Sequence, residues 1–154
     1  MTLVQDWFRV REEPAGVWII EEPLHSEQVK SYLVLGSARA ALIDTGMGVG
    51  DIRALVESLT SLPVIVLQSH AHNDHIGGSW QFDEVLVHQL EAGDLADGQT
   101  AERLANWFAP HEMSGPLPPG FEPRGYRIPG KTATGYLAEG DCVDLGERSL
   151  EVLH

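Results

Sequence analysis

The sequence predicts an α/β fold in which helices cover a layered sheet. Short apolar runs typical of strands recur along the chain, and a segment with helical spacing of its apolar residues lies between two of them. The chain has 154 residues, of which 43% are hydrophobic, which is enough for one core. We therefore expect a single domain over residues 1–154.

The first strands and the first helix are expected before residue 60. Residues 17–20 and 32–35 are strand-like, and residues 40–44 form a third strand that ends at an Asp-Thr-Gly turn. Asp51 is placed to cap a helix. The apolar positions of this helix follow at i, i+3, i+4 and i+7, and they are Ile52, Leu55, Val56 and Leu59.

The next strand leads to the segment that is most informative about function. Pro63 opens the run Val-Ile-Val-Leu over residues 64–67, which predicts a strand buried on both faces. Residues 84–88 predict another strand. Between these two strands, residues 69–78 read Ser-His-Ala-His-Asn-Asp-His-Ile-Gly-Gly.

This segment predicts a metal site. His70, His72 and His75 each offer a ring nitrogen to a metal, and Asp74 offers a carboxylate. Side chains alternate along extended backbone, so His70 and His72 project to the same side if the extended conformation continues. Residues 76–80 are expected to start a turn or helix that aims Asp74 and His75 at a second point. The spacing therefore predicts two adjacent ions, one for each pair of residues.

The residue types indicate hydrolysis. Zinc is the leading expectation for imidazole and carboxylate ligands, and iron and manganese are alternatives because they use the same ligands. Metal-held water has a pKa near ~7 and yields hydroxide at neutral pH. The hydroxide would attack the carbonyl of a small ester, thioester, lactone or amide. Asp74 is the catalytic candidate, because it would both bind one metal and orient the hydroxide.

The pattern His-x-His-x-Asp-His followed by Gly-Gly resembles the signature of the metallo-β-lactamase superfamily, which includes glyoxalase II-like thioesterases, lactonases, class B lactamases and several nucleases. Residues 40–46 resemble the strand and Asp-Thr-Gly turn before that family's metal loop. Residues 139–154 resemble the hairpin that leads to its Thr-Pro-Gly-His turn. The resemblance implies an αββα sandwich, of which this chain would form the N-terminal portion.

The resemblance also implies further ligands beyond those four residues. In the family a third histidine of the first site lies in the Thr-Pro-Gly-His segment, and a bridging aspartate and another histidine follow later. His154 would precede that segment, so it receives no ligand role. We expect the domain to be incomplete at its C-terminus. The alternative to a hydrolase is a non-catalytic metal-binding or structural fragment of the same fold.

Asp44 has three interpretations. The resemblance implies that it accepts a hydrogen bond from a ligand histidine and orients the ring, as carboxylates near metal sites do. A turn aspartate that caps its own backbone is the alternative. Asp-Thr-Gly also occurs in aspartic proteases, but these need two such carboxylates facing each other, and residues 44–46 are the one copy in this chain.

Residues 90–134 predict a lid or a linker. Residues 100–108 are expected to form one helix, ended by Pro110. Six prolines from position 110 to 129 exclude a regular helix or a central strand there. A surface linker and a lid over the metal site both remain open. In a lid, four aromatic residues would contact substrate, namely Trp107, Phe108, Phe121 and Tyr126.

The amino-acid composition limits the classes of partner and substrate that we expect. The formal net charge of −13 repels phosphate backbones, so nucleic acid is not expected and a small-molecule substrate is favoured. No apolar run approaches the ~20 residues of a membrane span. Cys142 is the single cysteine, for which a reducing cytoplasm is the simplest setting. Nothing in the sequence indicates the oligomeric state.

Overall fold

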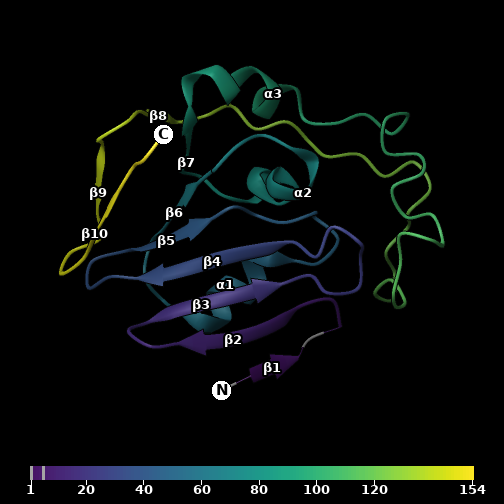
Figure 1. Ribbon diagram of the computed structural model, residues 1–154, viewed down its shortest axis with the longest axis horizontal. Helices are drawn as coiled ribbons and strands as arrows, with labels where there is room; N and C mark the ends of the chain where they lie inside the picture. The colour runs from purple at the N-terminus through teal and green to yellow at the C-terminus, as the bar shows by residue number, and fades with distance from the viewer. Residues whose placement is uncertain (1, 5) are drawn as a thin grey trace.

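The computed structural model describes residues 2–4 and 6–154, and its main feature is a sheet whose strands follow chain order. Neighbours from β1 to β5 are antiparallel, whereas neighbours from β5 to β8 are parallel (Figure 1). The strands are β1 (Thr2–Val4), β2 (Arg9–Glu13), β3 (Val17–Glu21), β4 (Lys30–Leu35), β5 (Ala40–Ile43), β6 (Val64–Leu67), β7 (Val85–His88) and β8 (Gly135–Leu137).

The expected α/β class is confirmed. The strands expected over residues 17–20, 32–35, 40–44, 64–67 and 84–88 correspond to β3 to β7, with ends that differ by no more than two residues. Strands β1, β2 and β8 were not expected from the sequence. Two of these, β1 and β8, lie at the ends of the sheet order.

In the described residues, three short helices cover or flank the sheet. The expected helix is α1 (Ile52–Leu59), and the Asp51 carboxylate accepts a hydrogen bond of 3.0 Å from the Ala54 amide at its N-terminus. The others are α2 (Asn73–Ile76) and α3 (Ala92–Asp97), with the 3₁₀ turns η1 (Ser79–Gln81) and η2 (Gln89–Glu91) between them. No helix in the described part of the chain is long and apolar enough to cross a membrane.

Both faces of the central sheet are buried. Val66 of β6 packs in the larger core with Leu55 and Val56 of α1, which lies behind the sheet in Figure 1. Ile65 and Leu67 point to the opposite face and pack against the hairpin of β9 (Cys142–Asp144) and β10 (Ser149–Glu151). This confirms that residues 64–67 form a strand buried on both faces, and that a hairpin lies within residues 139–154.

Residues 100–108 are a correction, because they form successive turns rather than one helix. Leu104 donates its amide to Thr100 four residues back, but Trp107 donates to Leu104 only three residues back. The carbonyl of Trp107 then accepts a hydrogen bond of 2.6 Å from Nε2 of His25 in the β3–β4 connection. This carbonyl is one of the last four of the expected helix, which have no partner inside a helix, so His25 satisfies it from another segment.

The aromatic residues of the proline-rich segment, residues 90–134, pack together. The ring of Phe108 lies 5.4 Å from Trp107, 5.2 Å from Phe121 and 5.5 Å from Tyr126, measured between centroids. All four rings are partly buried against the larger core. The segment therefore packs against the larger core. Contact of these rings with substrate stays a prediction.

Candidate metal centre

The candidate residues gather where two parallel strands end. Asp44 follows β5 and Ser69 follows β6, and the last residues of these strands, Ile43 and Leu67, pair in register. The Asp44 amide donates to the Leu67 carbonyl at 3.1 Å. Because β5 and β6 run in the same direction, their carboxyl ends lie at one edge of the sheet, where α/β proteins often bind ligands.

The buried carboxylate of Asp44 organises this edge. Its Oδ1 accepts from the Ser69 amide at 2.8 Å, and its Oδ2 accepts from the Ser69 hydroxyl at 2.7 Å and from Nδ1 of His75 at 2.8 Å. The Asp44 backbone is left-handed, with φ of 62°. The side chain thus hydrogen-bonds to the histidine loop, residues 69–72, and to His75 of α2. The hydrogen bond to His75 is compatible with the predicted orienting role of Asp44, which stays a prediction.

Ser69 extends the same network to a second histidine. Its Oγ lies 2.9 Å from Nδ1 of His70. A serine hydroxyl has one hydrogen, and this one goes to Asp44, so Oγ accepts from the N–H at Nδ1 of His70. His70 therefore carries its proton at Nδ1 and keeps Nε2 as the lone-pair nitrogen, whereas Nδ1 of His75 donates to Asp44 and Nε2 of the same ring faces Asp74. Ser69 was not among the predicted site residues, because a serine beside a histidine is not a distinctive pattern.

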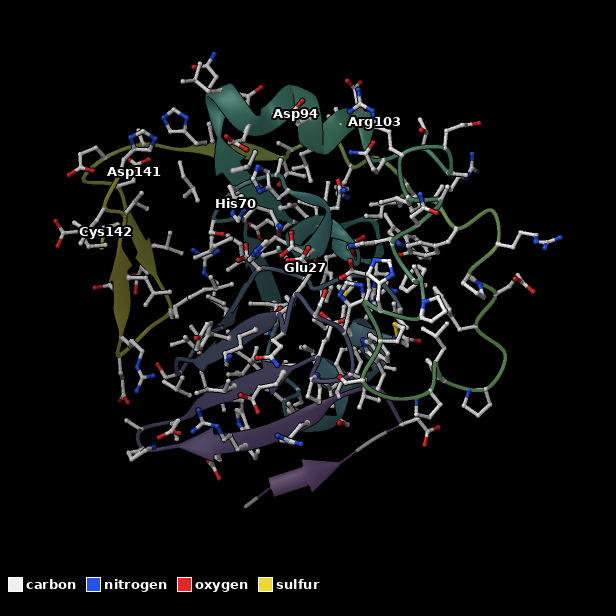
Figure 2. All side chains as sticks on the ribbon, turned by 45° about the vertical axis from the view of Figure 1, so that its right-hand side comes forward. Glu27, His70, Asp94, Arg103, Asp141 and Cys142 are labelled. Carbon is white, nitrogen blue, oxygen red and sulfur yellow. The ribbon has the colours of Figure 1, made fainter. Side chains whose placement is uncertain are left out.

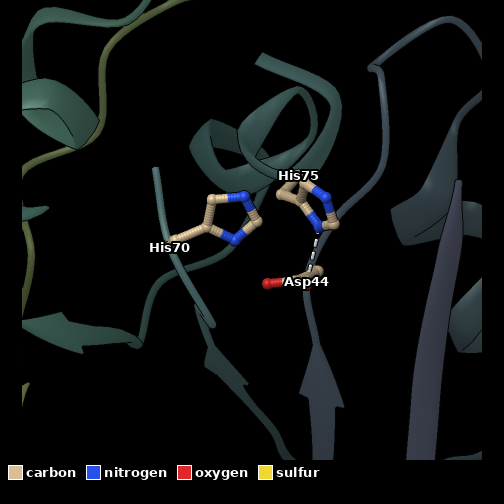
Figure 3. Close-up of side chains that lie close together, drawn as sticks. All are labelled: Asp44, His70 and His75. Atoms are coloured by element: carbon tan, nitrogen blue, oxygen red, sulfur yellow. Dashed lines mark hydrogen bonds and ion pairs between the residues drawn. The ribbon is translucent and has the colours of Figure 1, made fainter. Parts of the chain in front are cut away.

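The structure places the four predicted ligands near one another, but the group whose ligand atoms all lie close together contains His70 and His75 with Asp44, not His72 and Asp74. Ligand atoms of Asp44, His70 and His75 all lie within 4.8 Å of one another (Figure 3). The His70 ring centroid is 4.5 Å from that of His72 and 4.2 Å from that of His75. Oδ2 of Asp74 lies 3.1 Å from Nε2 of His75. Convergent imidazole nitrogens and carboxylate oxygens are the donor set that zinc and related transition metals prefer, so these residues fit such an ion.

The helix after the histidines begins earlier than expected. We expected a turn or helix to start within residues 76–80, but α2 already begins at Asn73, with His72 as its N-cap residue. Asp74 and His75 consequently lie in its first turn. The amide of His75 donates to the carbonyl of His72 at 3.0 Å, which fixes the backbone between the two predicted ligand pairs.

The charges in the cluster depend on one another. Hydrogen bonds to Asp44 and then to Asp74 raise the pKa of His75 to about 10. Burial works against ionisation of Asp74, but the hydrogen bond and positive charge of His75 hold the pKa of that carboxyl below its usual value. Burial and then the neighbouring His75 lower the pKa of His70. In the metal-free state the cluster therefore holds a proton on His75 that a metal ion would displace.

Two further side chains, which lie 20 or more positions later in sequence, form hydrogen bonds with the histidine loop and with α2. Oε2 of Glu91 accepts from the amide of Ala71, between the two histidines of the His-x-His pair, at 2.8 Å. Nε2 of Gln99 donates to Oδ1 of Asn73 at 2.8 Å. Neither residue belongs to a motif, so no signal in the sequence pointed to them.

A pocket of about 550 Å³ opens beside the cluster. His72 and Asp74 form part of its wall, and Trp107 of the proline-rich segment forms another part. Figure 2 shows Glu27, Asp94 and Arg103, which also line it, on the same side of the molecule as His70. The pocket is polar and lies next to the predicted ligands, so a small substrate would have room there.

The family model described as the metallo-beta-lactamase superfamily matches residues 26–154. The chain belongs to this superfamily. It is 31% identical to the acyl-coenzyme A thioesterase MBLAC2 of Bos taurus and to that of Homo sapiens, in each case over 97% of this chain. This superfamily member spans 58% of the length of those relatives.

Solved structures agree with the fold. A metallo-beta-lactamase from Cronobacter sakazakii matches 98% of this chain and 54% of its own, with a TM-score of 0.64 and 23% identity. The subclass B3 metallo-beta-lactamase BJP-1 of Bradyrhizobium japonicum matches 97% of this chain and 53% of its own, with a TM-score of 0.65 and 18% identity. The superfamily member therefore has the N-terminal part of the metallo-β-lactamase fold, as the resemblance of the histidine motif implied.

Proposed function

We propose that this superfamily member is a metal-dependent hydrolase that cleaves small acyl substrates, thioesters foremost. The observation that carries the proposal is the cluster at the ends of β5 and β6, in which Asp44 holds His75 directly and His70 through Ser69. Such preorganised ligands are a feature of working metal sites. Zinc is the proposed metal, with two ions, and iron or manganese are the alternatives.

The proposed ligands are His70, His72, Asp74 and His75. A bound divalent ion would supply a Lewis acid that polarises a carbonyl and lowers the pKa of water. The chain itself contributes the fixed donor geometry. Asp44 keeps the proton of His75 on Nδ1, and Asp74 presents its carboxylate next to Nε2 of the same ring.

The substrate class follows from the relatives and the charge. The relatives at 31% identity are named acyl-coenzyme A thioesterases. The net charge of −13 disfavours nucleic acids. The pocket of about 550 Å³ beside His72 and Asp74 falls in the size range of small-molecule sites. We therefore place a small acyl thioester ahead of lactones, other esters and β-lactams.

The test is a hydrolysis screen combined with metal analysis. The zinc-loaded protein is assayed against acyl-coenzyme A thioesters, a lactone, a simple ester and a β-lactam, and its metal content is measured. We expect turnover of the thioesters and a drop of at least about 100-fold in Asp74→Ala, as for loss of a group that stabilises the reacting atoms. Asp141→Ala is a matched control, since that aspartate is exposed on the β8–β9 connection.

The possible results distinguish a metal-dependent hydrolase from a non-catalytic metal-binding protein of the same fold. Unchanged hydrolysis in Asp74→Ala, or a protein that takes up no transition metal, would rule out the proposed mechanism. Stoichiometric metal with no hydrolysis of any of the four substrates would favour the non-catalytic metal-binding alternative.

A further inference from the structure

Glu22 is a buried carboxyl that the metal cluster does not use. It directly follows β3, and only 2% of its surface is exposed. Its Oε1 accepts from Nε1 of Trp7 at 2.6 Å, and its Oε2 accepts from the amide of Met47 at 2.9 Å. No ion pair among residues 2–4 and 6–154 includes it. A carboxyl buried without a cation is costly, so its contacts need an explanation.

The loop that Glu22 holds, residues 45–48, is bonded to the helix that carries two predicted ligands. The amide of Thr45 donates to the carbonyl of His75 at 2.8 Å, and the amide of Gly77 donates to the carbonyl of Gly46 at 2.8 Å. The packing is tight: a Cβ on Gly46 would lie 2.1 Å from Oε2 of Glu22, and one on Gly77 would lie 2.1 Å from the carbonyl carbon of Met47. Movement of this 45–48 loop would therefore be transmitted to α2.

Tyr126 holds the same residue of the loop from the other side. Its hydroxyl donates to the carbonyl of Met47 at 2.6 Å. The ring is partly buried and packs 5.1 Å from Phe121, measured between centroids. Met47 itself is fully buried. Its amide is thus fixed by Glu22 of the sheet and its carbonyl by Tyr126 of the proline-rich segment.

We propose that Glu22 and Tyr126 are positioning residues for the metal centre: they clamp the backbone of Met47 and, through the 45–48 loop, fix α2 so that Asp74 and His75 face the ion. The metal in this inference comes from the proposed function. The clamp, meaning the two hydrogen bonds that hold the Met47 backbone, comes from the geometry alone. It also gives the proline-rich segment a connection to α2 through the 45–48 loop, in addition to the direct bond from Gln99 to Asn73, so this segment takes part in metal binding without supplying a ligand.

Zinc affinity is the first test. The metal-free protein and the variants Glu22→Gln and Tyr126→Phe are titrated with zinc against a chromophoric chelator. We expect the more weakly bound ion to lose about tenfold in affinity in Glu22→Gln, the effect typical of an outer-shell partner, and less in Tyr126→Phe. The double variant should lose less than the product of the two single losses, because both side chains act on one residue.

The controls are matched in chemistry. Glu21→Gln makes the same change one position earlier, and Tyr136→Phe removes the hydroxyl of a tyrosine that is 59% exposed on β8. Both should bind zinc as the unsubstituted protein does. If Glu22→Gln and Tyr126→Phe lower only the melting temperature and leave the zinc affinity of the folded protein unchanged, the two residues are merely structural and the inference is wrong.

Amide hydrogen exchange tests the clamp without metal. The amides of Thr45 and Gly77 join the loop to α2, so they should exchange faster in the metal-free Glu22→Gln and Tyr126→Phe variants. The amide of Gly140, which bonds to Val152 in the hairpin, should not change. Unchanged exchange at Thr45 and Gly77 would refute the clamp. Failure of the unsubstituted protein to bind zinc would instead refute the proposed function, while exchange would still decide the clamp.

Discussion

A single carboxylate, that of Asp44, determines the protonation pattern of the candidate site. It accepts three hydrogen bonds, two from Ser69 and one from His75. Ser69 donates its hydroxyl to Asp44 and accepts from Nδ1 of His70, so the rings of His70 and His75 both turn Nε2 toward the centre. Substitutions at this scale should therefore change metal affinity more than they change the fold.

Ser69→Ala removes the link between His70 and Asp44. We expect zinc affinity to fall by roughly tenfold, because the His70 ring loses the partner that fixes its tautomer. Nitrogen NMR of the imidazoles should show a mixture of tautomers at His70 in place of one. Ser61→Ala is the control, since that exposed serine lies outside the cluster. If His70 keeps a single, unchanged tautomer in Ser69→Ala, Ser69 does not fix the tautomer of His70 and the prediction is wrong.

The metal-free protein should hold a proton on His75 far above neutral pH. The pKa of this histidine is raised from 6.5 to about 10, first by the hydrogen bond to Asp44. Its contribution to stability is therefore complete below pH 6.5 and is lost as the pH rises through about 10. Asp44→Asn should move the midpoint of the His75 proton signals downward in an NMR titration. A midpoint near 6.5 in the unsubstituted protein would contradict this.

Glu22 should make stability depend on pH in the acidic range. Burial raises its pKa from 4.5 to about 7, so its contribution to stability is full below pH 4.5 and is lost as the pH rises through 7. The loss amounts to about 3 kcal/mol at 1.36 kcal/mol per pKa unit. The free energy of unfolding in urea should be measured across this pH range for the unsubstituted protein and for Glu22→Gln. The difference between the two free energies should change by about that amount. Glu21→Gln should show no such trend.

At the scale of elements, the site depends on glycines that let the 45–48 loop and α2 touch. Gly77 has an ordinary helical φ of −57°, so its conformation alone would permit alanine. The obstacle is contact, because an added Cβ would lie 2.1 Å from the Met47 carbonyl carbon. The Gly-Gly that follows the histidines is therefore a packing requirement of the loop behind them.

Gly77→Ala should destabilise the protein by about 1–3 kcal/mol, the usual cost of overpacking, and weaken zinc binding. Gly93→Ala provides the comparison, since a Cβ there meets nothing within 4 Å and the residue lies in α3. That change should be neutral or stabilising by up to about 1 kcal/mol. Denaturant unfolding of both variants checks the prediction, and equal effects would count against it.

The elements that the sequence predicted are those fixed by local pattern. The strands β3 to β7 and the helix α1 with its Asp51 cap have periodic apolar residues and clear breakers. Residues 100–108 also have a helical pattern, but the contact of His25 with Trp107, 82 positions apart in sequence, belongs to no local pattern. The same limit applies to the site: the His70–His75 spacing is visible in the sequence, whereas Glu22, Glu91 and Tyr126 act through contacts between distant segments.

At the scale of the whole molecule, the central sheet separates two cores of unequal size. The larger lies on the side of α1, and the smaller is covered by the β9–β10 hairpin through Val143 and Leu145. The candidate metal cluster lies at the edge of the sheet, at the ends of β5 and β6. Both cores contribute to holding that edge in place.

Leu145→Ala tests the smaller core. Its side chain is fully buried, so truncation should cost about 2–5 kcal/mol of stability. Leu153→Ala is the control, because that side chain is 79% exposed. Thermal and urea unfolding should separate the two variants clearly. Equal stability of both would mean that the hairpin does not form a cooperative part of the fold.

The left-handed backbone of Asp44 restricts which residues evolution can place at that position. With φ of 62°, the position tolerates glycine, asparagine and aspartate far better than other residues. Glutamate has the charge but not this conformational tolerance, and asparagine has the conformation but not the charge. Aspartate alone satisfies both demands, so a lineage that retains the metal should show almost no variation at position 44, and one that loses the metal should drift there first toward asparagine or glycine.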